Sequence, residues 1–160
     1  MKKLKTTLFM MTVIAVMASC TKKGEPSKQG ELFTTEQIKK LATDQSMNGK
    51  QITVEGYAGL CNSMFVTKGT KNEMTVYSDG FCKGEKLINL QIKISKGDIP
   101  LTGDAPRNFG SFADDKNLSN EALTFMTDDY QEVKNGKLKF SGTVIYNGND
   151  VSLDNVTIHK

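Results

Sequence analysis

Apolar and polar residues change their spacing once along this 160-residue chain. In the first part, Ile38, Leu41 and Ala42 follow the i, i+3, i+4 spacing of one helix face. Thr34 or Thr35 precedes them as a residue that caps helix N-termini. Downstream of this segment, apolar and polar residues alternate with the period of half-buried strands. The pattern therefore predicts one N-terminal helix followed by a mainly β domain.

Five strands are predicted after the helix, and the third has the clearest alternation. Its apolar residues at even positions alternate with Asn89, Gln91 and Lys93, so one face is expected in the core and the other in water. Gly56, in the first strand, lacks a side chain and marks a point where a barrel strand is expected to bend. The predicted strands are residues 50–60, 74–78, 88–94, 138–146 and 151–158.

The last two predicted strands are joined by Asn147-Gly148-Asn149-Asp150. Asn-Gly between alternating runs is the strongest short-range signal of a hairpin. In the final strand the apolar residues before Asp154 are out of phase with those after Asn155. This slip predicts a β-bulge at these two residues.

A long connection, residues 97–131, separates the third and fourth predicted strands and contains two of the three prolines. Apolar residues behind Ser119 predict a short helix over residues 120–126. The pairs Asp114-Asp115 and Asp128-Asp129 offer oxygen ligands for calcium, but they lack the alternating ligands and glycine of an EF-hand loop. Both pairs are therefore expected to be solvated acidic turns, and no metal site is predicted.

Three strands, a helical connection and two further strands is the element order of the OB-fold, a five-stranded Greek-key barrel. Matching segments are Gly49-Lys50 before Ile52-Thr53-Val54-Glu55-Gly56, Gly136-Lys137 before Phe140-Ser141-Gly142-Thr143-Val144, and Val151-Ser152-Leu153-Asp154-Asn155-Val156. In these segments the chain resembles the tRNA-anticodon-like OB-fold family of bacterial lipoproteins, over residues 34–159. The resemblance implies an OB-fold domain over residues 32–160, with an N-terminal helix before the barrel. It implies no contact with tRNA, because the family name describes a similarity of fold.

The N-terminal residues have the parts of an export signal: basic residues, an apolar run and small residues before a cysteine. The apolar run, residues 8–18, is shorter than the roughly 20 residues that span a bilayer core. Met17-Ala18-Ser19-Cys20 resembles the lipobox of bacterial lipoproteins, with Met17 where the family usually has Leu. The resemblance implies that residues 1–19 are a signal peptide and that Cys20 carries lipid such as palmitate. The alternative is ordinary cleavage with Cys20 as an incidental thiol.

Residues 20–31 contain lysines and a proline with few apolar residues, which predicts a flexible tether to the membrane. Thr21 follows the lipidated residue, where inner-membrane lipoproteins of some bacteria have aspartate. This favours the outer membrane of the cell envelope, with the domain facing the periplasm.

Cleavage of the leader changes the charge of the protein. The chain has 21 basic and 18 acidic residues, and three of the basic residues but none of the acidic ones lie in the leader. The mature chain therefore has 18 of each and a formal charge of zero. Such a chain lacks the basic excess of general nucleic-acid binders, which argues against a nucleic-acid partner.

Lipidation of Cys20 leaves Cys61 and Cys82, in a compartment that favours disulfides. A disulfide between them is expected to stabilise the fold by roughly 3 kcal/mol. A metal site needs more ligands, and a redox pair in a CxxC motif is absent from the sequence.

No catalytic or cofactor motif is found in the sequence. The single histidine, His159, is the penultimate residue and is expected at a strand end on the surface. No serine or carboxylate stands at a spacing that suggests a triad. A hydrolase is therefore the weakest hypothesis, and no cofactor is predicted.

The outer face of strands 1 to 3 is the usual ligand surface of OB-folds. The predicted phase places on it aromatic and amide side chains, which suit stacking and hydrogen bonding to a glycan or a base. These residues are Tyr57, Tyr77, Asn89, Gln91 and Lys93. Two hypotheses stay open: a binding domain for an envelope protein partner or for envelope maintenance, which is favoured, and an oligosaccharide- or oligonucleotide-binding module.

Overall fold

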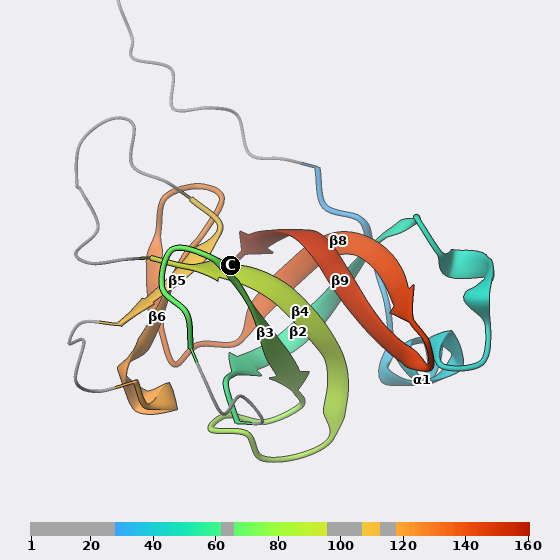
Figure 1. Cartoon of the computed structure of the whole chain (residues 1–160), viewed down its shortest axis with the longest axis horizontal. Coiled ribbons are helices and arrows are strands. Elements are labelled where there is room, and N and C mark those ends of the chain that lie inside the picture. The colour runs from blue at the N-terminus through green and yellow to red at the C-terminus, as the bar shows by residue number, and fades with distance from the viewer. Residues whose placement is uncertain (1–27, 62–65, 96–106, 113–117) are drawn as a thin grey trace, which may run out of the picture.

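The computed structural model describes residues 28–61, 66–95, 107–112 and 118–160, which form a mainly β structure with one α-helix (Figure 1). Five strands close into a barrel in the order β2-β3-β4-β9-β8, and β8 pairs again with β2. Only the β4–β9 pair within this ring is parallel. This closed barrel is consistent with an OB-fold-like architecture. The strands are β2 (Gln51–Gly59), β3 (Lys71–Tyr77), β4 (Lys86–Ile94), β8 (Leu138–Asn147) and β9 (Asp150–His159).

All five predicted strands are confirmed, with ends that differ by up to three residues. One face of each strand supplies the core, but the predicted alternation is incomplete, because Thr75, Tyr77 and Asn89 on the opposite face are also buried. Val54, Leu90 and Phe140 come from three different strands and are fully buried. The rings of Phe140 and Phe125 meet edge to face, with centroids 6.0 Å apart.

Gly56 is the residue at which β2 changes its partner strand. It pairs with Leu138 of β8, whereas the next residue, Tyr57, pairs with Tyr77 of β3. A Cβ atom at Gly56 would lie 2.5 Å from the carbonyl oxygen of Tyr77 and 2.5 Å from Cγ1 of Val76. The predicted bend therefore lies at a close approach that only glycine permits.

The predicted helix is confirmed as α1 (Thr35–Leu41). Thr34 is the N-cap, and it forms a capping box with Gln37 in which each side chain bonds the other residue's backbone N–H. Ile38 and Leu41 are buried against the barrel. In the described part of the chain, no helix has the length and apolarity to cross a membrane.

The barrel also holds the chain that precedes α1. β1 (Glu31–Leu32) runs parallel to the start of β2. The hydroxyl of Thr53 donates a hydrogen bond to the backbone oxygen of Gly30 at 2.9 Å. The side-chain amide of Gln51 donates to the backbone oxygen of Lys28 at 3.4 Å. Among the described residues, Lys28 is the first to contact the barrel, and it lies within the segment predicted as a tether.

The long connection differs from its prediction. It contains the strands β5 (Phe109–Phe112), β6 (Leu123–Met126) and β7 (Glu132–Lys134), which extend the sheet beyond β4 and are called the annex below (Figure 1). The helix predicted over residues 120–126 is wrong, because only Asn120–Ala122 form a 3-10 turn. All four residues of β6 are buried. A short apolar run without alternation does not distinguish a buried strand from a helix.

The predicted hairpin and bulge are both confirmed. Asn147 pairs with Asp150 across the turn between β8 and β9. Further along, Ser141 pairs with Thr157 and Thr143 with Asp154, so β9 has one extra residue there. Asn155, in the bulge, has a left-handed backbone with φ 50°.

Candidate functional site

The predicted disulfide between Cys61 and Cys82 is present, with 6.0 Å between the Cα atoms. Cys61 follows the end of β2, and Cys82 lies in the turn between β3 and β4. A Cβ atom at Gly59 would lie 3.0 Å from Sγ of Cys82, so the strand approaches the disulfide closely because it has glycine there. The disulfide therefore fixes the β3–β4 turn onto the end of β2.

Asn120 connects the annex to this disulfide. Its amide nitrogen lies 3.5 Å from Sγ of Cys61 and 3.2 Å from Sγ of Cys82. Its side-chain oxygen accepts a hydrogen bond from the backbone N–H of Leu60 at 2.8 Å. One side chain thus joins β2, the β3–β4 turn and the annex.

Phe81 is the most unusual residue of this region. Its backbone is left-handed, with φ 53°, and so is that of Cys82, with φ 61°. This conformation is rare for bulky residues and costs roughly 1–2 kcal/mol in each. The phenylalanine side chain is nevertheless 51% exposed, so burial of the ring does not offset the cost.

Hydrogen bonds within the β3–β4 turn keep this conformation. The backbone N–H of Ser78 donates to the carbonyl oxygen of Glu85 at 3.0 Å, and the N–H of Glu85 donates to the Ser78 hydroxyl at 2.8 Å. The N–H of Gly80 donates to Oδ1 of Asp79 at 2.7 Å. Phe81 is therefore held on a turn that is closed by both hydrogen bonds and a disulfide.

A small hollow of about 30 Å³, open to solvent, lies beside this turn and is called the Phe81 hollow. Its walls come from the end of β2, the β3–β4 turn and the annex, and none of the described residues that line it is charged. Next to Gly136, an ion pair joins Nζ of Lys137 to Oε2 of Glu55 at 2.6 Å, and the same hydrogen bond raises the pKa of Lys137. The lining residues are Tyr57, Ala58, Gly59, Gly80, Phe81, Cys82, Asn120, Leu123, Phe125, Asn135 and Gly136.

The structure does not gather the five predicted ligand-binding residues into one surface. Tyr57 lines the Phe81 hollow, but its cross-strand partner Tyr77 is only 8% exposed. Asn89 is also buried, and its side-chain oxygen accepts a hydrogen bond from the Thr75 hydroxyl at 3.0 Å. The expectation that all five face solvent is therefore wrong for two of them. Gln91 is half-buried and Lys93 is exposed, and they pair across strands with Glu73 and Lys71.

A second hollow of about 280 Å³ lies between α1, β4 and the β8–β9 hairpin. Asn89 and Lys86 line it, together with Lys39 from the helix. Nζ of Lys39 is already paired with Oε1 of Glu85 at 2.7 Å, which raises the pKa of this lysine. This hollow is wider than the first, but it has no aromatic ring and no strained residue among its lining.

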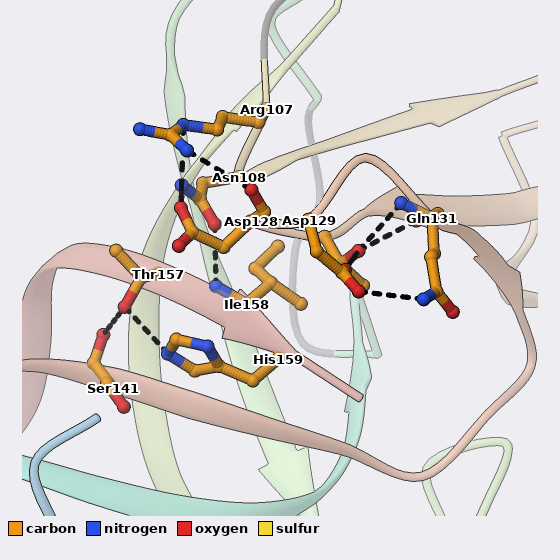
Figure 2. A network of polar contacts seen from close by, with 10 residues as sticks. Arg107, Asn108, Asp128, Asp129, Gln131, Ser141, Thr157, Ile158 and His159 are labelled. Carbon is orange, nitrogen blue, oxygen red and sulfur yellow. Dashed lines mark hydrogen bonds and ion pairs between the residues drawn. The ribbon is translucent and has the colours of Figure 1, made fainter. Parts of the chain in front are cut away.

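His159 is buried rather than exposed, so the prediction of a surface histidine is wrong. Only 7% of the residue is exposed, and Nε2 lies 3.1 Å from the Thr157 hydroxyl (Figure 2). Burial lowers the pKa of His159, whereas Asp128 and Asp129 act in the opposite direction. The turn after β6 covers this end of β9, which a local pattern in the sequence does not reveal.

The residues around His159 include a hydroxyl and an acid, and each of them is bonded to a further residue. The Thr157 hydroxyl donates to the backbone oxygen of Ser141 at 3.4 Å, and the Asp128 carboxylate is bonded to Asn108 and Arg107 (Figure 2). A triad needs an acid that orients the histidine, and here the acid is engaged elsewhere. Neither Thr157 nor His159 lines either hollow.

The prediction that the two acidic pairs form solvated turns holds only in part. Asp128 is 2% exposed and ion-paired, so the prediction of a solvated turn is wrong for it, while Asp129 is exposed. Asp114 and Asp115 lie outside the described residues. Within the described residues, no group of three or more histidine, cysteine or acidic side chains is placed to bind a metal ion.

No family model matches the chain, and comparisons with curated proteins and with solved structures found no match. The site is therefore interpreted from its own geometry. Phe81 was not among the predicted ligand-binding residues. The sequence Ser78-Asp79-Gly80 is typical of a turn, and the aromatic residue and cysteine that follow it could have pointed to Phe81.

Proposed function

We propose that this chain is a lipid-anchored envelope protein whose barrel, an OB-fold, binds a protein partner through the surface around Phe81. The observation that carries the proposal is Phe81: an exposed aromatic ring on a strained backbone, fixed by a disulfide. Aromatic side chains that fill a pocket on the partner protein dominate the binding energy of many protein interfaces. Backbone strain that serves no packing role is typical of binding sites.

The anchor and the location rest on the sequence. The leader and the lipobox-like Met17-Ala18-Ser19-Cys20 support lipidation of Cys20, and Thr21 favours the outer membrane with the barrel facing the periplasm. The proposed role is non-catalytic, because the buried His159 group lacks the relay of a triad and lies outside the hollow.

An oligosaccharide that lies across the surface around Phe81 is the second candidate ligand. Tyr57 and Phe81 offer ring faces, and the side chain of Asn135 offers an amide for hydrogen bonds. An oligonucleotide fits less well, because the lining has no cation for phosphate.

Site-specific photo-crosslinking in intact envelopes tests the protein partner. A photoreactive residue at Phe81 is expected to capture one protein, whereas the same residue at Leu118, which is 40% exposed, is the matched control. The captured protein is then identified, purified and titrated with the wild-type chain. Phe81→Ala should weaken this binding by about tenfold or more, as loss of an aromatic anchor does.

Equal capture at Leu118, or a Kd that Phe81→Ala leaves unchanged, contradicts the proposal. A glycan array tests the oligosaccharide, with the wild-type chain and Phe81→Ala as the two proteins compared. A glycan that binds wild type, loses affinity for Phe81→Ala and displaces the captured protein would instead support the oligosaccharide.

A further inference from the structure

The hollow of about 280 Å³ between α1, β4 and the β8–β9 hairpin, called the hairpin hollow below, lies where the barrel wall opens. The parallel pairing of β4 with β9 covers two positions, Asn89 with Ser152 and Leu90 with Leu153. Towards the hairpin the described residues 86–88 and 150–151 are not paired with each other. The hairpin hollow occupies this gap. Its volume is close to that of the smallest pockets that hold small ligands, roughly 300 Å³.

The walls of the hairpin hollow are partly apolar and come from elements that are fixed to one another. Ile38 and Ala42 line it from α1, and Val151 lines it from β9. The ion pair between Lys39 and Glu85 joins the helix to the turn that precedes β4. A formed cavity with an apolar wall and a few polar groups is typical of small-molecule sites.

Asn89 supplies an unused hydrogen-bonding group at the hairpin hollow. Only 8% of the residue is exposed, and its side-chain oxygen accepts a hydrogen bond from the Thr75 hydroxyl. Its amide nitrogen has no hydrogen bond to any described residue. Every completely buried side-chain nitrogen or oxygen in the described ranges has a partner, so this nitrogen reaches an opening, and Asn89 lines the hairpin hollow. A nearly buried donor without a partner favours a ligand oxygen at this place.

Two exposed charges line opposite sides of the hairpin hollow. Lys86 belongs to β4 and Asp150 to β9, and neither side chain has an ion pair or a hydrogen bond with a described residue. Continuing the parallel register from Asn89 and Ser152 places Asp150 opposite Leu87, the residue next to Lys86. A small ligand that carries both a carboxylate and an ammonium group can therefore pair with both charges.

We infer that the hairpin hollow binds a small zwitterion with an apolar side chain, of the class of amino acids and dipeptides. Its carboxylate accepts hydrogen bonds from Asn89 and Lys86, and its ammonium group pairs with Asp150. Its side chain packs against Ile38 and Val151. This site is separate from the surface around Phe81, and it depends neither on the lipid anchor nor on the protein partner proposed above.

Calorimetric titration of the purified full chain tests the inference, with the standard amino acids and dipeptides of apolar amino acids as probes. At least one probe should bind. Its amide, which lacks the carboxylate, and its N-acetyl form, which lacks the ammonium group, should each bind about tenfold or more weakly. The inference is overturned if no probe binds, or if the amide or the N-acetyl form binds as tightly as the parent.

Substitutions test the place of binding. Lys86→Met and Asn89→Asp should each weaken the probe about tenfold or more, because Asn89→Asp keeps the acceptor for Thr75 but replaces the amide donor by a negative charge. Lys83→Met is the matched control, an exposed lysine of the β3–β4 turn outside the lining, and it should bind like wild type, as should Phe81→Ala. Thermal unfolding checks that each variant is folded. If Asn89→Asp does not fold, Lys86→Met decides, since its side chain is exposed. Equal affinities of Lys86→Met and Lys83→Met would show that the probe binds elsewhere and that the inference is wrong.

Discussion

The backbone N–H of Ile158 donates a hydrogen bond to the side-chain oxygen of Asn108 at 2.7 Å, and this contact ties the end of β9 to the start of the annex (Figure 2). The amide nitrogen of Asn108 donates to Oδ1 of Asp128 at 2.8 Å. The backbone N–H of Asp128 in turn donates to the carbonyl oxygen of Ile158 at 2.7 Å. The three residues thus form a closed set of polar contacts between barrel and annex.

Asp128→Ala is expected to lower the free energy of unfolding by about 2 kcal/mol, because it leaves the half-buried amide donor of Asn108 without its acceptor. It also removes the carboxylate that lies 3.5 Å from Nε of Arg107. Urea denaturation measures the change. Glu132→Ala, an exposed acid of the same annex, is the control and should stay within about 0.5 kcal/mol of wild type. Equal effects of the two substitutions would show that the Asp128 contacts do not stabilise the annex.

The buried His159 predicts a loss of stability in weak acid. Burial lowers its pKa below the ordinary 6.5, and Lys139 lowers it slightly further, although Asp128 and Asp129 oppose the shift. The unfolded chain therefore binds the proton more readily than the folded one. The contribution of the neutral ring is present above pH 6.5 and is lost as the pH falls from 6.5 through the lowered pKa of the folded state.

His159→Gln should remove this part of the pH dependence. Urea unfolding of both proteins at pH 7.5 and at pH 5.5 isolates the effect, because the remaining acids are the same in the two chains. Wild type is expected to lose more stability between the two pH values than His159→Gln. The same loss in both would mean that His159 is not the group responsible.

Gly56→Ala is expected to lower the free energy of unfolding by more than 2 kcal/mol, since the new methyl group would lie 2.5 Å from the backbone oxygen of Tyr77. Gly148→Ala is the matched control. Gly148 has φ +64° but nothing within 4 Å of a Cβ position, so this substitution should cost only about 1 kcal/mol. Urea or thermal unfolding compares the two. A smaller loss for Gly56 than for Gly148 would contradict the importance of the close approach between β2 and β3.

Local sequence patterns predicted the parts of the fold that local physics decides. Alternation gave the five barrel strands, and the phase slip before Asn155 gave the bulge. The annex strand β6 was missed because its four buried residues have no alternation, and its strand partners lie up to 17 residues away in sequence, as Phe109 and Met126 do. His159 was misplaced for a similar reason, since its cover comes from the turn at Asp128.

The candidate site was predicted in part. Tyr57 and the disulfide follow from strand phase and cysteine count, and both belong to the Phe81 hollow. The place of Phe81 at the hollow depends on a left-handed backbone that the disulfide and the turn impose together. Residue type alone does not report such a conformation, because phenylalanine normally avoids it.

Phe81→Gly separates stability from binding at this site. Glycine adopts the left-handed backbone without the cost of roughly 1–2 kcal/mol that a Cβ atom imposes, but it loses about 0.5–1 kcal/mol through the entropy of the unfolded chain. The ring that is removed is 51% exposed and contributes little to the core. The free energy of unfolding should therefore stay unchanged or rise by up to about 1 kcal/mol.

Phe81→Ala is the matched control for this experiment, because it removes the same ring but keeps the Cβ atom and its strain. Both variants should lose about tenfold or more in affinity for the captured partner, measured by titration with the purified protein. Only Phe81→Gly should be as stable as wild type or more stable in urea. If glycine instead lowers the free energy of unfolding by more than about 1 kcal/mol, the ring supports the fold, and its exposure is not evidence for binding.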